Sequence, residues 1–349
     1  MAQQLRTFHV DTGRKYFSPE EMEDFMTQAA ANGYNSMEIC IGNCGWRFLL
    51  DDMTIETEGK TYGSDAVKAA FRTGNRTYCD SGRNEWTEEE MIRMLTFAGE
   101  KGLEIIPLMD SPGHMEATLT AMKELGIRHP SYQGSVSAMD LENPEVTAFV
   151  RALMEKYTGW FVDHGCKYIN FGADEYGNDV GAVPGFTRLQ QQGDESYALF
   201  IRYANDMARM IMDKGAAAVM YNDGMYYDQN DRCGLLDPRI ICSYWTDGWD
   251  GYPLAPAAFI AEKGHAILNT NHEWYYVLGR SEGKPGPHKY SFESAIRGLE
   301  SVPPEEVYHG EGVPCMGSMV CLWCDEPEMP YDEAEKEKLR QMIACRVKK

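Results

Sequence analysis

The sequence has few basic residues and no long hydrophobic run. It carries 33 Lys and Arg against 54 Asp and Glu over 349 residues, a formal net charge of -21. A chain this acidic repels phosphate backbones and anionic membrane surfaces. We therefore expect neither nucleic acid nor a membrane as a partner. No stretch approaches the roughly 20 apolar residues of a membrane span. The first residues contain no apolar signal segment, so we expect a cytoplasmic location.

Signatures of nucleotide and metal binding are also missing. No GxGxxG follows the first predicted strand, and there is no P-loop. The 10 cysteines are scattered. Cys321 and Cys324 form a CxxC without a second such pair, which favours buried free thiols over a zinc or redox site. Neither a cofactor nor a metal is expected, and the sequence leaves the oligomeric state open.

Short β-rich runs alternate with helical patterns along the whole chain. Strands are predicted at 7–11, 36–42, 103–110, 168–175, 217–223, 240–245, 265–271 and 318–326. Helices are predicted at 18–33, 87–102, 143–160, 194–215, 254–264, 291–301 and 332–347, two of them opening on the capping residues Ser18 and Thr87. This alternation predicts a (β/α)8 TIM barrel, a single catalytic domain over 1–349. An open doubly wound sheet is the alternative, without a nucleotide signature to support it.

One long segment, about 43–86, shows no clear periodicity. It is rich in glycine and polar residues and follows the second predicted strand. Long irregular segments in compact domains are commonly functional loops, although a plain surface elaboration is an equal alternative. We therefore expect a loop insertion here.

Polar and aromatic residues gather where the predicted strands end. In a barrel these ends share one face, where the βα loops build the active site. Carboxylates beside aromatic rings suit a sugar, whose ring faces stack while its hydroxyls take hydrogen bonds. The candidate site residues are Arg14, Asp110, His114, Asp174, Glu175, Tyr221, Asp223, Trp245, Tyr275, Trp323 and Asp325.

The fourth predicted strand ends in two adjacent acids, Asp174 and Glu175. Successive strand residues point to opposite sides, so the two carboxylates are expected to serve different targets. Such a pair suits substrate-assisted hydrolysis better than the usual pair of separated carboxylates. Two other hypotheses remain for this site. One is a non-catalytic sugar-binding barrel, which would not need the acid Glu175. The other is a metal-dependent barrel hydrolase, whose metal ligands would be Asp110, His114, Asp174, Glu175 and Asp223.

Seven motifs, in chain order, resemble those of glycoside hydrolase family 20, the β-N-acetylhexosaminidases. "NFGADE" at 170–175 resembles H-x-G-x-D-E of that family. The others are "DTGRKYFSPEEM", "IPLMDSPGHM", "MYNDGM", "SYWT", "EWYYV" and "CLWCDE". The resemblance covers nearly the whole chain. No small domain precedes the matched region in this sequence, so the chain resembles the single-domain members of the family. Three residues differ from the family's usual ones. Asn170 stands where the family has His, Tyr221 where it has Trp, and Leu108 where it has Glu.

The resemblance implies an exo-acting enzyme that removes terminal β-linked GlcNAc or GalNAc with retention, through an oxazolinium ion. Glu175 would be the general acid and base, and Asp174 would orient the 2-acetamido group. Tyr275, or Tyr276 in the other register, would donate to the acetamido oxygen. Arg14 and Asp325 would bind sugar hydroxyls, with Asp11 supporting Arg14. The remaining substrate-binding residues implied are Asp110, His114 (near the acid), Tyr221, Asp223, Trp245 and Trp323.

Overall fold

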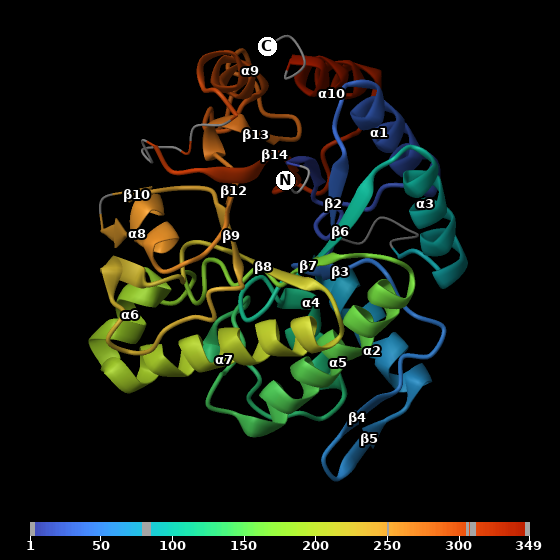
Figure 1. Cartoon of the computed structure of the whole chain (residues 1–349). Helices are drawn as coiled ribbons and strands as arrows, with labels where there is room; N and C mark the ends of the chain where they lie inside the picture. The colour runs from blue at the N-terminus through green and yellow to red at the C-terminus, as the bar shows by residue number, and fades with distance from the viewer. Residues whose placement is uncertain (1–3, 79–84, 250, 305–306, 308–311, 346–349) are drawn as a thin grey trace.

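The chain forms a closed barrel of eight parallel strands (Figure 1). The computed structural model describes residues 4–78, 85–249, 251–304, 307 and 312–345. The barrel strands are β1 (Leu5–Val10), β2 (Ser36–Asn43), β6 (Glu104–Met109), β7 (Tyr168–Asn170), β8 (Ala217–Tyr221), β9 (Ile241–Tyr244), β12 (Ile267–Asn269) and β14 (Cys315–Trp323). Strand β1 pairs with both β2 and β14, which closes the circle. The predicted (β/α)8 barrel is therefore confirmed.

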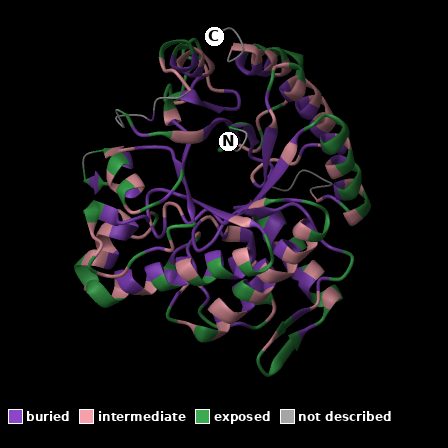
Figure 2. Ribbon diagram, viewed as in Figure 1, coloured by how far each residue is buried: buried purple, intermediate pink, exposed green. Residues whose placement is uncertain are grey.

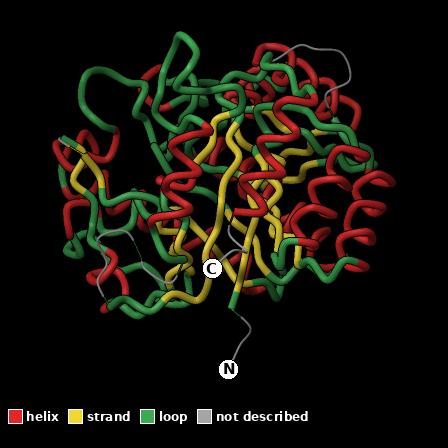
Figure 3. Tube along the Cα trace, turned by 90° about the horizontal axis from the view of Figure 1, so that it is seen from above, coloured by secondary structure: helices red, strands yellow, loops and turns green. Residues whose placement is uncertain are grey.

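Helices cover the outside of the barrel, as the side view in Figure 3 shows. The predicted ones are present as α1 (Pro19–Ala31), α3 (Glu88–Glu100), α5 (Pro144–Asp163), α7 (Asp194–Asp213), α8 (Ala257–Glu262), α9 (Phe292–Ser301) and α10 (Glu333–Cys345). Local capping explains where α1 begins, because the Ser18 hydroxyl accepts from the Glu21 N–H while the Glu21 carboxylate accepts from the Ser18 N–H. Thr87 and Glu90 cap α3 in the same way. The last two residues of the predicted helix 332–347 lie outside the described residues.

The segment 43–86 corrects our expectation of an irregular loop insertion. It contains β3 (Gly45–Trp46), the hairpin of β4 (Ile55–Thr57) and β5 (Lys60–Tyr62), and helix α2 (Ser64–Tyr78), while residues 79–84 lie outside the described part. The buried Asn75 holds α2 to the barrel, because its side-chain amide bonds both the N–H and the C=O of Trp46 at 2.7 Å. Helix α2 also packs on α4 (Glu116–Glu124). These contacts join segments that are distant in the sequence, so the periodicity of hydrophobic residues does not predict them.

The fourth barrel strand is shorter than predicted, and this changes the argument about the two acids. Strand β7 ends at Asn170, so Asp174 and Glu175 lie beyond it in a turn. Positive φ angles at Gly172 (69°), Ala173 (64°) and Glu175 (48°) shape this turn. A Cβ at Gly172 would lie 2.0 Å from Asp110 Oδ1, so only glycine fits there. A twisted turn, not strand alternation, therefore directs the two carboxylates.

The barrel interior combines an apolar cluster with buried polar side chains, and Figure 2 shows the barrel strands as almost entirely buried. Its central cluster includes Leu108, Val219, Leu268 and Met319. The remaining short elements are α6 (Gly185–Gln192), β10 (Gly248–Trp249), β11 (Tyr252–Pro253), β13 (Tyr275–Val277), η1 (Tyr132–Gly134), η2 (Tyr227–Gln229) and η3 (His272–Trp274). Nowhere in the described part of the chain does a helix combine the length and the apolarity needed to cross a membrane.

Candidate active site

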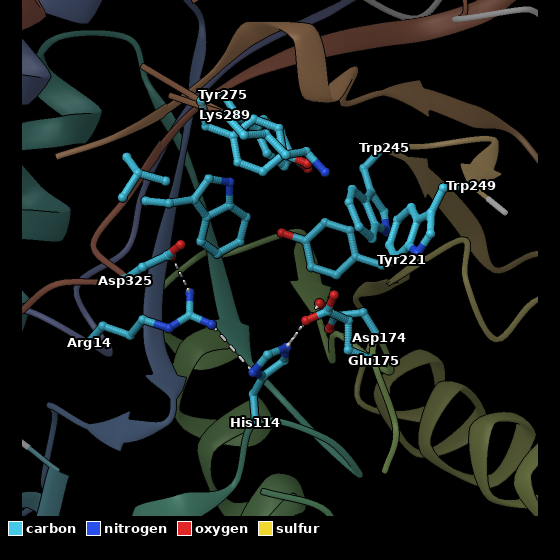
Figure 4. A pocket seen from close by; sticks show the side chains of 13 residues that line it. Arg14, His114, Asp174, Glu175, Tyr221, Trp245, Trp249, Tyr275, Lys289 and Asp325 are labelled. Carbon is cyan, nitrogen blue, oxygen red and sulfur yellow. Dashed lines mark hydrogen bonds and ion pairs between the residues drawn. The ribbon is translucent and has the colours of Figure 1, made fainter. Parts of the chain in front are cut away.

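A cavity of about 300 Å³ opens at the carboxyl ends of the barrel strands (Figure 4). Its size is at the lower end of the range for ligand pockets, which suits one sugar ring. The predicted residues that line it are Arg14, His114, Asp174, Glu175, Tyr221, Trp245, Tyr275, Trp323 and Asp325. Asp110 and Asp223 lie behind this lining. The cavity is also lined by Trp249, Val277, Lys289 and Tyr290, which the sequence did not single out.

Arg14 is held at one end of the cavity by two carboxylates. Its backbone N–H donates to Asp11 Oδ1 at 3.1 Å, and its Nη1 lies 3.0 Å from Asp11 Oδ2. Asp11 is fully buried and also accepts the Cys324 N–H, so it ties the end of β1 to the end of β14. On the cavity side, Asp325 Oδ1 lies 3.6 Å from Arg14 Nη1. The half-exposed Asp325 and the cation together present both acceptors and donors for hydroxyl groups.

Asp174 carries a negative charge that its neighbours stabilise. His114 Nε2 lies 3.4 Å from Asp174 Oδ2 and 3.4 Å from Glu175 Oε2. Burial by itself would lower the pKa of His114, but Asp174, together with Cys44 and Glu175, raises that pKa well above its usual value. Burial likewise opposes the charge on Asp174, yet His114 lowers the pKa of Asp174 below its usual value. The two groups therefore form an imidazolium–carboxylate pair.

Asp110, at the end of β6, supports Asp174 from behind. Burial, and then the Asp174 charge, raise the pKa of Asp110 well above its usual value, so Asp110 keeps its proton. A hydrogen bond between the two side chains further lowers the pKa of Asp174. Asp110 Oδ1 also accepts the Ala173 N–H at 3.2 Å, which fixes the turn that carries Asp174. Asp110 is thus a support for the site, placed where it does not line the cavity.

Glu175 lies at the mouth of the cavity, with 37% of its side chain exposed. Its backbone N–H donates to Asp223 Oδ2 at 2.8 Å. The buried Asp223 also accepts from Trp245 Nε1 at 2.7 Å and from the Tyr252 hydroxyl at 3.0 Å. Asp223 therefore fixes Glu175 and a wall of the cavity with a single carboxylate. Burial, and next the charge of Asp174, raise the pKa of Asp223 to about 7.

Aromatic rings line the cavity from Trp245 across to Trp323, whose ring centroid lies 5.6 Å from Arg14 Cζ. The rings of Trp245 and Tyr275 are nearly parallel, at 10° with centroids 6.2 Å apart, and the Trp323 ring lies 5.6 Å from Tyr275. The two adjacent tyrosines lie on different sides of the chain. The Tyr276 hydroxyl donates to the Glu335 carboxylate and accepts the Gly279 N–H, away from the cavity. Only Tyr275 of this pair lines the cavity.

A buried polar cluster, which the sequence did not reveal, lies beneath the cavity. Glu38 Oε1 accepts from the Tyr221 hydroxyl at 3.3 Å and lies 2.8 Å from His9 Nδ1, and its Oε2 accepts from Asn170 at 2.8 Å. The His9 ring in turn packs 4.3 Å from the Trp323 ring. Tyr221 and Asn170, two of the three departures from the family motifs, thus meet at one carboxylate. Charged residues inside the apolar runs "SMEICIG" and "TFHVD" were the available signal.

The rim beside Glu175 consists of residues from two loops. Trp249, 46% exposed, belongs to the short β10–β11 hairpin. Lys289 Nζ lies 5.3 Å from the Trp249 ring centroid and 4.6 Å from that of Tyr290. Burial lowers the pKa of Lys289, while the charge of Glu175 acts in the opposite direction. The sequence signal for this rim was weak, because loop residues follow no period.

Two groups of side chains in the described residues have the donor atoms to hold a metal ion. Asp110, His114 and Asp174 are one group, and their donor atoms lie within 4.8 Å of one another. Within this group His114 pairs with Asp174 at 3.4 Å, and Asp110 keeps its proton. Cys44, His114 and Glu116 are the other group.

Comparison with known proteins agrees with this geometry. The family model "Glycosyl hydrolase family 20, catalytic domain" matches residues 4–338. A solved structure of a GH20 catalytic module from the pneumococcal exo-β-D-N-acetylglucosaminidase StrH has a TM-score of 0.92 and 36% identity, covering 99% of this chain and 83% of that chain. Dispersin B has a TM-score of 0.72 at 20% identity, covering 99% of this chain and 98% of its own, and so shows the fold alone.

Curated relatives are more distant. Lacto-N-biosidase from Bifidobacterium bifidum is 25% identical over 199 residues, which are 55% of this chain and 17% of that protein. β-Hexosaminidase subunit A1 from Dictyostelium discoideum is 22% identical over 284 residues, 77% of this chain and 48% of that protein. The chain therefore spans less than half the length of these two relatives.

Replacing Asp223 with Asn is expected to flatten the dependence of folding stability on pH. The folded-state pKa of about 7 lies above the unfolded value of about 3.9. Between these values only the folded state holds the proton, so this contribution to stability is complete below about pH 4 and is lost as the pH rises through 7.

The measurement is the free energy of unfolding in denaturant at pH 5 and pH 8, for wild type, Asp223→Asn and the exposed control Asp163→Asn. The difference between the two pH values should shrink in Asp223→Asn and not in the control. An equal difference in all three proteins would contradict the assignment.

Proposed function

Because the chain belongs to glycosyl hydrolase family 20, we propose that it is an exo-acting β-N-acetylhexosaminidase acting on glycans that end in β-linked GlcNAc or GalNAc. The observation that carries the proposal is the charged Asp174, paired with His114 at 3.4 Å, next to Glu175 at the mouth of an aromatic-walled cavity. A carboxylate in that position can polarise the substrate's own acetamido group. A second protein nucleophile is then unnecessary.

In the first step the substrate supplies the nucleophile. Asp174 accepts the acetamido N–H, which makes the acetamido oxygen a better nucleophile toward the anomeric carbon. As the bond from this oxygen to C1 forms, the glycosidic bond breaks, and Glu175 gives its proton to the leaving oxygen. The negative charge on Asp174 stabilises the positive oxazolinium ion. Tyr275 donates to the acetamido oxygen and orients it.

In the second step Glu175, now a carboxylate, takes a proton from water. The water oxygen attacks C1 from the side that the leaving group vacated, and the bond from the acetamido oxygen to C1 breaks. Two inversions at C1 give a product with the original β configuration. The proton taken by Glu175 restores the acid, so the cycle closes without a cofactor.

The two ends of the cavity correspond to the two sides of the bond that is cleaved, the terminal sugar and the leaving group. Arg14 and Asp325 close one end and bind the hydroxyls of the terminal sugar, which supports exo action. Glu175 is at the other end, beside Trp249, Lys289 and Tyr290. We assign the leaving group to this rim, where the exposed Trp249 ring offers a stacking face.

Glu175→Gln should remove most of the hydrolysis of p-nitrophenyl β-N-acetylglucosaminide or of its galactosaminide epimer. General acid–base catalysis contributes about 10²–10⁴-fold, so kcat should fall within that range. The loss should be larger for a disaccharide substrate, because a sugar alkoxide needs the proton more than nitrophenolate does. The control Glu155→Gln, at a half-exposed side chain on the outer helix α5, should keep wild-type kcat.

Plain p-nitrophenyl β-glucoside and added EDTA complete this experiment. The glucoside should not be turned over, because it lacks the acetamido nucleophile, and EDTA should leave the rate unchanged. Equal rates on the glucoside would eliminate the acetamido group from the mechanism. Loss of activity in EDTA would favour a metal-dependent hydrolase, and binding without turnover of any substrate would favour a sugar-binding protein.

Tyr275→Phe and Tyr276→Phe should separate catalysis from stability. Removing the Tyr275 hydroxyl should lower kcat by about 100-fold, because the acetamido oxygen loses the donor that holds it in position for attack on C1. Tyr276→Phe should leave kcat nearly unchanged but destabilise the fold by about 1–3 kcal/mol, because Glu335 and the Gly279 N–H lose a buried partner. Steady-state kinetics and denaturant unfolding measure the two effects, and the reverse pattern would contradict the assignment.

Trp249→Ala should weaken binding of the leaving-group sugar. Loss of a stacking face of about 0.5–1.5 kcal/mol raises KM for a disaccharide roughly 2- to 12-fold. Inhibition by free N-acetylglucosamine is the control, since this sugar fills only the inner end and its Ki should not change. A change in Ki as large as the change in KM would place Trp249 in the inner site instead.

A further inference from the structure

We propose that Cys44, His114 and Glu116 form a binding site for a borderline-soft divalent cation such as Zn²⁺ beside the sugar cavity, and that its occupation stops hydrolysis. The Cys44 Sγ lies 3.7 Å from His114 Nδ1, and the donor atoms of all three residues lie within 4.8 Å of one another. Neighbouring donor atoms of a tetrahedral zinc site are about 3.3–3.6 Å apart, given Zn–S near 2.3 Å and Zn–N near 2.0 Å. Small side-chain movements would bring the three donors to that spacing.

The backbone already holds the three residues together. The Cys44 N–H donates to the His114 C=O at 2.6 Å, and the Cys44 C=O accepts the Ala117 N–H at 2.7 Å. Both Cys44 (φ 60°) and His114 (φ 49°) adopt the left-handed conformation, which side chains other than glycine rarely take. The chain therefore fixes the thiol against the segment 114–117, so little ordering remains when an ion binds.

The surroundings of His114 match those of a metal ligand. Its Nδ1 faces Cys44, while its Nε2 lies 3.4 Å from the Asp174 carboxylate. Ligating histidines commonly donate their second N–H to a carboxylate in this way, which fixes the tautomer and the ring. Glu116 adds an independent observation, because its Oε2 is buried and accepts no hydrogen bond from the described residues. A cation would give that oxygen a partner.

The donor set selects the class of ion. One thiolate, one imidazole and one carboxylate suit Zn²⁺ and similar transition-metal ions, whereas Mg²⁺ and Ca²⁺ take oxygen ligands. On binding, the Sγ–metal bond replaces the S–H bond, and the proton leaves to solvent. His114 likewise gives up the proton on Nδ1.

Binding at this site would disable the hydrolase site described above, and this consequence rests on the proposed function. Arg14 Nη2 lies 3.4 Å from His114 Nδ1, so an ion there must displace the guanidinium that binds the sugar hydroxyls. The ion would also replace the proton on His114 Nδ1, so the charge of the bound metal would take the place of the imidazolium charge beside Asp174 and Glu175. Metal and sugar should therefore compete, although Cys44 and Glu116 themselves do not line the cavity.

The site can be tested without any substrate. Co²⁺ is added to the full-length metal-free protein, and the thiolate-to-cobalt absorption in the near ultraviolet is recorded. The control is Cys324→Ser, which removes another buried thiol close to Arg14. Wild type and this control should both show an absorption band that saturates as Co²⁺ is added. Cys44→Ser should lose it, and Glu116→Gln should need at least tenfold more Co²⁺. A band that persists in Cys44→Ser, or no band in wild type, would overturn the site.

Inhibition by Zn²⁺ tests the consequence. Wild type and Cys324→Ser should be inhibited reversibly, with activity restored by EDTA and with substrate protecting against the ion. Cys44→Ser and Glu116→Gln should need at least tenfold more Zn²⁺ for the same inhibition. Equal sensitivity in all four proteins would assign the inhibition to another group, such as Asp110, His114 and Asp174, and would overturn the proposal. If no substrate is cleaved, the proposed function fails while the cobalt titration still decides the site.

Discussion

The negative charge on Asp174 is the feature on which the rest of the site depends. A buried carboxylate ordinarily holds its proton, because burial raises its pKa. Here His114 at 3.4 Å lowers that pKa, and the protonated Asp110 gives the second support. The anion is thus prepared before a substrate arrives. A charge fixed in advance stabilises a developing cation without the cost of reorganising solvent.

Neighbouring strand ends hold this arrangement through backbone contacts. Asp110 from β6 accepts the Ala173 N–H, and Asp223 after β8 accepts the Glu175 N–H, so the strands on both sides of β7 shape the turn between them. Asp11 does the same between β1 and β14 for Arg14. Each of these carboxylates supports a residue of the cavity while lying behind or beside it. Closure of the barrel is what brings these supports within hydrogen-bond distance.

One residue, His114, connects two sites of different chemistry. Its Nε2 serves the carboxylates of the hydrolase site, and its Nδ1 faces the Cys44 thiol and the Arg14 guanidinium. A ring with two nitrogens can face both sites, but its proton and its charge cannot serve both at once. Any group that engages Nδ1 therefore acts on Asp174 and Arg14 together. This gives a physical route from the thiol side of the barrel to the sugar side.

The sequence by itself determined the order of the eight barrel strands, the capped starts of α1 and α3, and nine of the thirteen residues that line the cavity, because periodicity and capping are local properties. Contacts between distant segments decided the rest. Asp110 packs against Gly172 in the turn that follows β7, and Asn75 holds α2 to the barrel within the segment expected to be irregular. Packing of Tyr276 against Glu335 left Tyr275 in the cavity, and two loops brought Trp249 beside Lys289. No local pattern encodes these contacts, since each depends on residues that only the closed barrel brings together.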